Sequence, residues 1–171
     1  MSYLVRKISK AKWDKIKDIT DCKQIDGDVI SDLRTTSNTL SFWQINDINE
    51  LDEAALALAA SSKTSIIEKV TVVWIPEELF EFIRVECNSG DTIISDLTEK
   101  HRDLCNVTYG SLGRIATLVQ NQINASNCKI YTKKNVEKLL VDAYNSNRII
   151  KTCCDEKLLN TIESISQKNK I

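Results

Sequence analysis

The sequence is poor in the residues that interrupt regular structure, with one proline and four glycines among 171 residues. This shortage argues against a β-sandwich with many turns and favours long helices joined by tight connections. No stretch approaches the roughly 20 consecutive apolar residues that a membrane span requires. The first residues, MSYLVRKISKAKW, lack the apolar core and the cleavage pattern of a signal peptide. We therefore expect a cytoplasmic protein with no membrane partner.

The sequence also has few of the groups that carry catalysis. It contains a single histidine and six cysteines, and no two cysteines have the CxxC spacing. It contains no P-loop, GxGxxG, HExxH, GxSxG or EF-hand pattern. We expect reduced cysteines that pack as small hydrophobic side chains, no metal and no resident cofactor. These absences lower the expectation of an enzyme without excluding one.

Two local cysteine patterns are candidates for metal or thiol chemistry. His101 and Cys105 are four residues apart in a segment predicted to be helical, so they would share one face. A zinc ion would need two further ligands, and the sequence supplies none at a recognisable spacing. Cys153 and Cys154 fall in the predicted first turn of a helix, where a soft metal or a vicinal disulfide is conceivable. For both patterns the simpler interpretation is a packed or exposed free thiol.

The composition predicts a folded globular chain, with 42% hydrophobic and 27% charged residues. Alternating or apolar runs predict strands at residues 3–9, 39–45 and 70–75. The second carries bulky side chains on both faces, so we expect it inside the sheet. Helical spacing also predicts a short basic helix at residues 10–19. Between the second and third predicted strands, Asp47 is a candidate N-cap for a helix that begins near residue 48. A strand, a helix and a strand in this order predict a right-handed parallel crossover.

After Pro76 the pattern becomes mainly helical, with segments predicted at residues 77–86, 92–104, 109–123, 133–145 and 153–167. One short strand is expected at residues 128–132. We predict an α/β fold, with a mixed α+β arrangement as the alternative. Its sheet of three to four strands would lie in an α/β unit of residues 1–90. Residues 91–171 would form a helical portion packed on that unit.

The net charge of −1 hides an uneven distribution. Residues 46–103 carry 5 basic and 13 acidic side chains, whereas both flanking parts are net basic. We hypothesise that the chain binds another protein. It would be either an inhibitor that resembles immunity proteins or antitoxins, or an accessory subunit of a larger bacterial complex. Its acidic centre would face a basic partner, with fast and salt-sensitive association.

The candidate interface residues are Trp13, Trp43, Glu50, Asp52 and Glu53. A solvated helix surface is the alternative interpretation, and nucleic acid is an unlikely partner because no basic run occurs.

A dense polar cluster follows Arg34 and leads into the second predicted strand. Its guanidinium group could hold a phosphate, and the first predicted strand carries a second arginine, Arg6. The competing hypothesis is therefore a nucleotide- or NAD-using enzyme whose pocket contains Arg6, Arg34, Thr36, Asn38 and Ser41. Serine, threonine and asparagine also satisfy backbone groups of their own loops, so a purely structural loop remains the alternative.

This order of a first-strand arginine and a second-strand Ser/Thr cluster resembles the layout of small NAD-dependent ADP-ribosyltransferases. The resemblance implies NAD as the cofactor and a pocket at these residues. It covers only residues 3–45, and no glutamate motif follows at a strand end. Glu53, in the acidic helix, is no convincing substitute for that glutamate.

Overall fold

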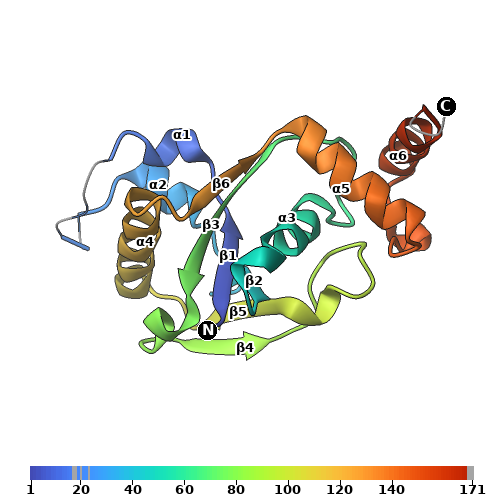
Figure 1. Ribbon diagram of the computed structural model, residues 1–171. Helices are drawn as coiled ribbons and strands as arrows, with labels where there is room; N and C mark the ends of the chain where they lie inside the picture. The colour runs from blue at the N-terminus through green and yellow to red at the C-terminus, as the bar shows by residue number, and fades with distance from the viewer. Residues whose placement is uncertain (17–18, 20, 23, 169–171) are drawn as a thin grey trace.

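The computed structural model describes residues 1–16, 19, 21–22 and 24–168, and it places one antiparallel sheet, flanked by helices, at their centre (Figure 1). Six strands form this sheet in the described residues, in the order β4-β5-β2-β1-β3-β6. All neighbouring strands are antiparallel. The strands are β1 (Tyr3–Lys7), β2 (Leu40–Ile45), β3 (Val70–Pro76), β4 (Arg84–Cys87), β5 (His101–Cys105) and β6 (Cys128–Tyr131).

Helices cover both faces of the sheet. One face carries α1 (Lys10–Trp13), α2 (Gly27–Asp32) and α4 (Tyr109–Asn124), and the other carries α3 (Leu51–Ala59) and α5 (Lys133–Asn145). The last helix, α6 (Glu156–Lys168), packs on α5. No helix in the described part of the chain combines the length and the apolar character that crossing a bilayer requires. The basic helix predicted after residue 10 is short, and its predicted continuation at residues 17–18 lies outside the described residues.

The alternation of side chains along the inner strands explains why the sheet has two covered faces. Leu40 and Phe42 of β2 pack under α4, whereas Trp43 and Ile45 pack under α3. All four are buried, which confirms the prediction that this strand lies inside the sheet. Burial of each such side chain contributes about 1.5–3 kcal/mol, so β2 connects two separate apolar layers.

The predicted sheet of three to four strands is too small, and the predicted helical C-terminal half is helical only in part. Residues 77–86 form one 3₁₀ turn, η2 (Glu77–Phe80), followed by β4. Residues 92–104 form a loop, a second 3₁₀ turn, η3 (Thr98–Lys100), and most of β5. Both segments also have a period of two over four or five residues, and pairing with neighbouring strands outweighs their helical spacing.

The predicted parallel crossover is correct in direction only. Both β2 and β3 are antiparallel to β1, so they run the same way, and α3 connects them. However, β1 lies between them and supplies the hydrogen bonds to both. The sequence pattern indicates each strand but does not encode which strands become neighbours.

Two helix starts show how capping residues set element boundaries. Asp47 caps the 3₁₀ turn η1 (Ile48–Glu50) by accepting a hydrogen bond from the Asn49 amide at 2.7 Å, as the sequence predicts. The last helix begins at Glu156, later than the predicted start at residue 153. Asp155 accepts from the Lys157 amide at 2.9 Å, and residues 151–153 form a separate 3₁₀ turn, η4 (Lys151–Cys153).

Gly90 provides a test of packing between the loop after β4 and the sheet. A Cβ at this position would lie 2.5 Å from the Trp43 ring and 2.7 Å from the Cβ of His101. Trp43 is only 5% exposed and cannot easily move away. We expect Gly90→Ala to lower the free energy of unfolding by about 1–3 kcal/mol, as overpacked cores do. Urea denaturation monitored by tryptophan fluorescence measures this change.

Gly27→Ala is the matched control. A Cβ there meets no atom within 4 Å, and the residue begins α2. The free energy of unfolding should stay unchanged or rise by up to about 1 kcal/mol, because alanine favours the helix. Equal unfolding midpoints for the two variants would contradict the close packing at Gly90.

Candidate functional site

A cleft of about 750 Å³ lies at the end of the sheet where β1 ends and β3 begins. Its lining includes Ile8 and Thr71 from the sheet, both buried, and Ile130 of β6, which is 48% exposed. These residues form a partly apolar floor that opens to solvent beside β6. Four lysines surround the floor, namely Lys7, Lys10, Lys69 and Lys133.

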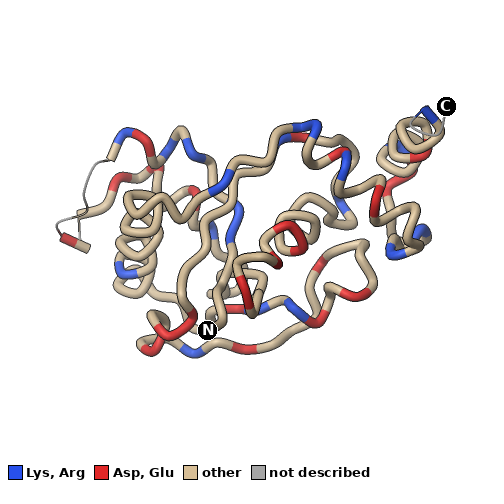
Figure 2. The backbone as a smooth tube through the Cα atoms, in the orientation of Figure 1, with Lys and Arg blue, Asp and Glu red and all other residues tan. Residues whose placement is uncertain are grey.

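The lysines come from four separate elements, and the sheet topology brings them together. Lys7 ends β1 and Lys69 precedes β3, and these two strands are antiparallel neighbours. Lys10 begins α1, and Lys133 begins α5 directly after β6, which pairs with β3. Figure 2 shows basic segments of α1, β6 and the start of α5 along one edge of the molecule.

The charge of the cleft is not neutralised by nearby carboxylates. None of the four lysine ammonium groups forms an ion pair or a hydrogen bond with any residue that the structure describes. Glu68 is the one acidic residue of the lining, so four lysines and one glutamate leave a net charge of +3. Concentrated positive charge over an apolar floor attracts a ligand that is both anionic and partly apolar.

The start of α5 adds to this positive potential. Lys133 and Lys134 stand in its first turn, which contains no acidic residue. The helix dipole is positive at this end, so each cation there costs about 0.3–1 kcal/mol. Thr132 and Asn135 form a capping box that keeps the helix start in place. A bound anion would relieve the repulsion that these lysines create.

Arg6, predicted to hold a phosphate, is occupied by the protein itself. Its guanidinium group donates to the backbone oxygens of Ser41 at 2.7 Å and Asp32 at 3.2 Å. It also lies over the Phe42 ring, 5.6 Å from the centroid. Burial lowers the pKa of Arg6 to about 10, while the nearby charge of Asp32 acts in the opposite direction. In this structure Arg6 connects β1, β2 and the end of α2.

The polar loop around Arg34 bonds largely to itself. Thr36 and Thr39 exchange two backbone hydrogen bonds, at 3.2 and 2.9 Å, across a turn whose central residues both have positive φ. The central residues are Ser37 and Asn38, with φ values of 52° and 58°, as in a type I′ turn. Arg34 is exposed and pairs with no described residue.

Ser41 points away from Arg6. Its hydroxyl donates to Asp103 at 3.0 Å on the α3 face of the sheet, whereas Arg6 lies on the α4 face with Phe42. Asn38 lines a separate hollow of about 500 Å³ near the start of α4. The five predicted ligand residues therefore do not converge on one point.

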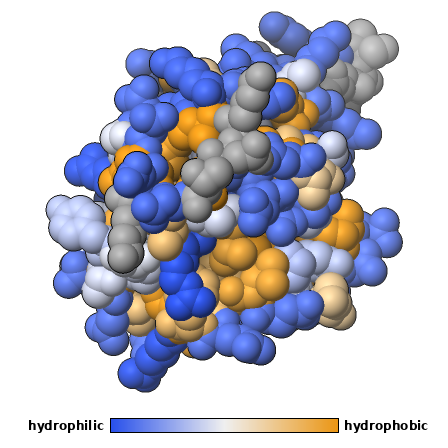
Figure 3. All heavy atoms as spheres, turned by 90° about the vertical axis from the view of Figure 1, so that its left-hand side faces the viewer, coloured by the Kyte–Doolittle hydropathy of each residue, from blue (hydrophilic) through white to orange (hydrophobic). Residues whose placement is uncertain are grey.

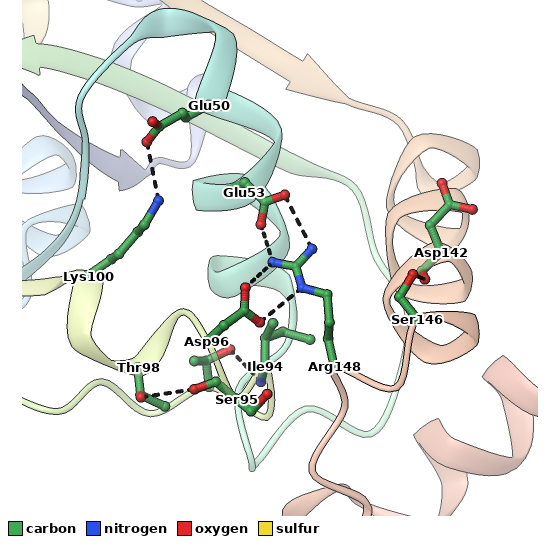
Figure 4. Close-up of polar contacts among 11 residues, drawn as sticks. Glu50, Glu53, Ile94, Ser95, Asp96, Thr98, Lys100, Asp142, Ser146 and Arg148 are labelled. Carbon is green, nitrogen blue, oxygen red and sulfur yellow. Dashed lines mark hydrogen bonds and ion pairs between the residues drawn. The ribbon is translucent and has the colours of Figure 1, made fainter.

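The acidic residues predicted as an interface form contacts within the chain. Glu50 pairs with Lys100 at 3.2 Å, and Glu53 pairs with Arg148, which also binds Asp96 at 2.7 Å (Figure 4). These pairs connect η1 and α3 to the segment before β5 and to the loop after α5.

Asp52 is likewise held, by Lys129 at 3.0 Å and by the Tyr131 hydroxyl at 2.6 Å. The Tyr131 hydrogen bond is the largest influence that lowers the pKa of Asp52. Burial and this carboxylate together raise the pKa of Tyr131 above its ordinary value.

The two tryptophans proposed as anchors are buried. Trp13 has no exposed surface, and its indole N–H donates to Asp32 at 2.7 Å. Trp43 is 5% exposed and meets His101 edge to face, with 5.3 Å between the ring centroids. As they stand, neither ring is available to a partner.

The predicted helical pairing of His101 and Cys105 is wrong, because both residues lie on β5. Four residues along a strand span about 13 Å, which is too far to share an ion. Partial burial and the neighbouring Glu86 raise the pKa of the Cys105 thiol. No group of three potential metal ligands occurs among the described residues, and Cys153 and Cys154 are both free thiols.

A second cavity, of about 770 Å³, lies beside the start of α4. Ile25, Ile30 and Phe82 make its lining largely apolar, and Arg114 stacks on Phe82 at 3.8 Å. In Figure 3, which views the molecule from the side of α2 and α4, hydrophobic residues gather among hydrophilic ones. Tyr109, at the rim, is 88% exposed.

Comparison with protein-family models, with curated proteins and with solved structures finds no match for this chain. Sequence reasoning missed the lysine-lined cleft because its four lysines are separated by up to 126 positions, from residue 7 to residue 133. The available signal was that each lysine stands next to a strand end or at a helix start.

Arg148→Met tests the ion pairs of the acidic segment. We expect the free energy of unfolding at pH 7 to fall by about 1–2 kcal/mol, because two carboxylates lose a shared partner that is itself only partly exposed. The Arg148 hydrogen bond lowers the pKa of Asp96, so this contribution is present above the ordinary aspartate pKa of about 3.9. It is lost as the pH falls through the lowered value. Urea denaturation at pH 7 and at pH 3 measures the difference.

Lys100→Met is the control, because Lys100 is partly exposed like Arg148 but forms a single described ion pair, with Glu50. Its cost should stay below about 1 kcal/mol. Equal losses in the two variants would contradict a special role for Arg148.

Lys133→Glu tests the electrostatic cost at the start of α5. The substitution removes a cation from the positive end of the helix and places an anion there, so the protein should become more stable by about 1 kcal/mol at low salt. The gain should shrink in 1 M salt because of screening. Thermal or urea unfolding measures both values. Loss of stability would show that Lys133 has a favourable partner within the chain.

Proposed function

We propose that this protein is a binding module that holds an acidic segment of another protein in the lysine-lined cleft. The observation that carries the proposal is the group of four lysines around an apolar floor, none of which pairs with a residue that the structure describes. A carboxylate that approaches these lysines breaks no ion pair with a described residue, and the cost of desolvating the ammonium groups stays small because they remain partly hydrated.

The chemistry of the lining favours a protein segment over a nucleic acid. The lining contains no arginine and no aromatic side chain, so it offers neither guanidinium forks for phosphates nor surfaces on which bases stack. It does contain three isoleucines, Ile8, Ile67 and Ile130, which suit the apolar side chains of an amphipathic peptide.

The proposal keeps the protein-binding function expected from the sequence and moves it to a different surface. Glu50, Asp52 and Glu53 already face Lys100, Lys129 and Arg148 of the same chain. A basic partner would have to compete with these pairs, whereas an acidic partner at the cleft would not. An inhibitor or an accessory subunit would act in this way, by occupying a partner and without chemistry of its own.

Fluorescence anisotropy with a labelled peptide of alternating glutamate and valine tests the proposal. We expect binding at low salt that weakens strongly towards 0.5 M salt. The double variant Lys69→Glu, Lys133→Glu should bind at least about tenfold more weakly, which corresponds to about 1.4 kcal/mol.

The matched control is Lys15→Glu with Lys157→Glu, which makes the same charge change at exposed lysines outside the cleft. It should keep most of the affinity. Equal weakening in both double variants would exclude the cleft as the site. Equal binding of a lysine–valine peptide would exclude charge as the basis.

A further inference from the structure

The cleft continues into a free sheet edge. The last strand in the sheet order is β6, so no described strand pairs with its outer side. Ile130 of this strand and Thr132 just after it both line the cleft. An exposed strand edge offers rows of backbone N–H and C=O groups to an added strand.

The hydrogen-bond pattern identifies which backbone groups face outward. The Trp74 amide donates to the Asn127 oxygen at 3.2 Å, and the same register pairs Val72 with Lys129. In an antiparallel ladder, residues directed at the partner strand alternate with residues directed away from it. Residues 127, 129 and 131 therefore bond to β3, and Cys128 and Ile130 present their N–H and C=O groups outward.

A hydrogen bond on the far side of β3 supports this assignment. Thr71, which stands opposite Ile130, accepts from the Ile8 amide of the neighbouring segment at 2.9 Å. The backbone of Thr71 is thus directed away from β6, as it must be if Ile130 faces solvent. Because Ile130 pairs with Thr71, its side chain lies on the same face as the cleft floor.

We propose that the acidic segment binds as an additional strand along β6, with its backbone paired to Cys128 and Ile130. This inference rests on the proposed function. Alternate side chains of the added strand would point to the cleft face, where acidic groups can reach Lys133 and Lys69. Backbone pairing supplies affinity without sequence preference, and the lysines select acidic side chains.

The charge distribution argues against a second copy of the chain at this edge. In an antiparallel pair of two β6 strands, with Cys128 opposite Ile130 of the other copy, Lys133 would lie beside residues 124–126, which offer no carboxylate to neutralise it. Lys129 of the same strand is not part of this site, because it pairs with Asp52 and lies over the Tyr131 ring. Charge complementarity therefore selects an acidic partner.

Residue-resolved amide hydrogen exchange with the glutamate–valine peptide tests strand addition. In the free protein the amides of Cys128 and Ile130 should exchange quickly, and the Lys129 amide, bonded to β3, should exchange slowly. Saturating peptide should slow exchange at Cys128 and Ile130 at least about tenfold and leave Lys129 unchanged. Unchanged exchange at Ile130 in the saturated complex would overturn the proposal.

Ile130→Pro provides a second measurement. The substitution removes an outward N–H and leaves the ladder with β3 intact, a position at which proline is tolerated. Peptide affinity should fall at least about tenfold, and it should fall further than in Ile130→Ala, which shortens the side chain but keeps the N–H donor. If the proline variant does not fold, amide exchange in the unaltered chain decides.

The two proposals can fail separately. Loss of binding in Lys69→Glu, Lys133→Glu together with unprotected Ile130 would retain the cleft as the site and reject the added strand. Equal binding by the unaltered chain and by that double variant would reject the cleft and the strand addition that rests on it.

Discussion

The antiparallel pairing of β1 with both β2 and β3 is the constraint on which the rest of the structure depends. Leu4 and Val5 are fully buried on opposite faces, so this strand contributes to both apolar layers at once. The direction of β1 also determines which residues lie together at the end of this strand. Because β3 begins where β1 finishes, Lys7 and Lys69 line the same cleft, and β6 then places the start of α5 beside it.

Charges that are separated along the sequence are mixed in the fold. The acidic segment takes partners from the basic C-terminal part, as in the contacts of Asp52 with Lys129 and of Glu53 with Arg148. These internal ion pairs neutralise most of the negative charge on the α3 surface. The lysines of the cleft have no such partners among residues 1–16, 19, 21–22 and 24–168. A chain with a net charge of −1 therefore carries a local surface of positive charge.

The sequence predicts the elements whose patterns are long or strongly capped. The two central strands and the cap at Asp47 follow from alternation and from side-chain chemistry. Short strands are harder, because in residues 101–105 a period of two competes with a helical spacing, and pairing with β2 decides the outcome. The cleft could not be predicted, since its position depends on strand order. The cluster after Arg34 attracted attention for its composition, whereas its positive φ angles at Ser37 and Asn38 show a hairpin turn.

The cleft combines residues from the beginning, the middle and the last third of the chain. During synthesis on a ribosome, a nascent chain could form β1, β2 and α3 long before β6 and Lys133 emerge. The anionic ligand would have no complete site until the last strand had joined the sheet. A partner that binds there would therefore recognise only finished molecules, and its binding energy would stabilise the whole fold and not one segment of it.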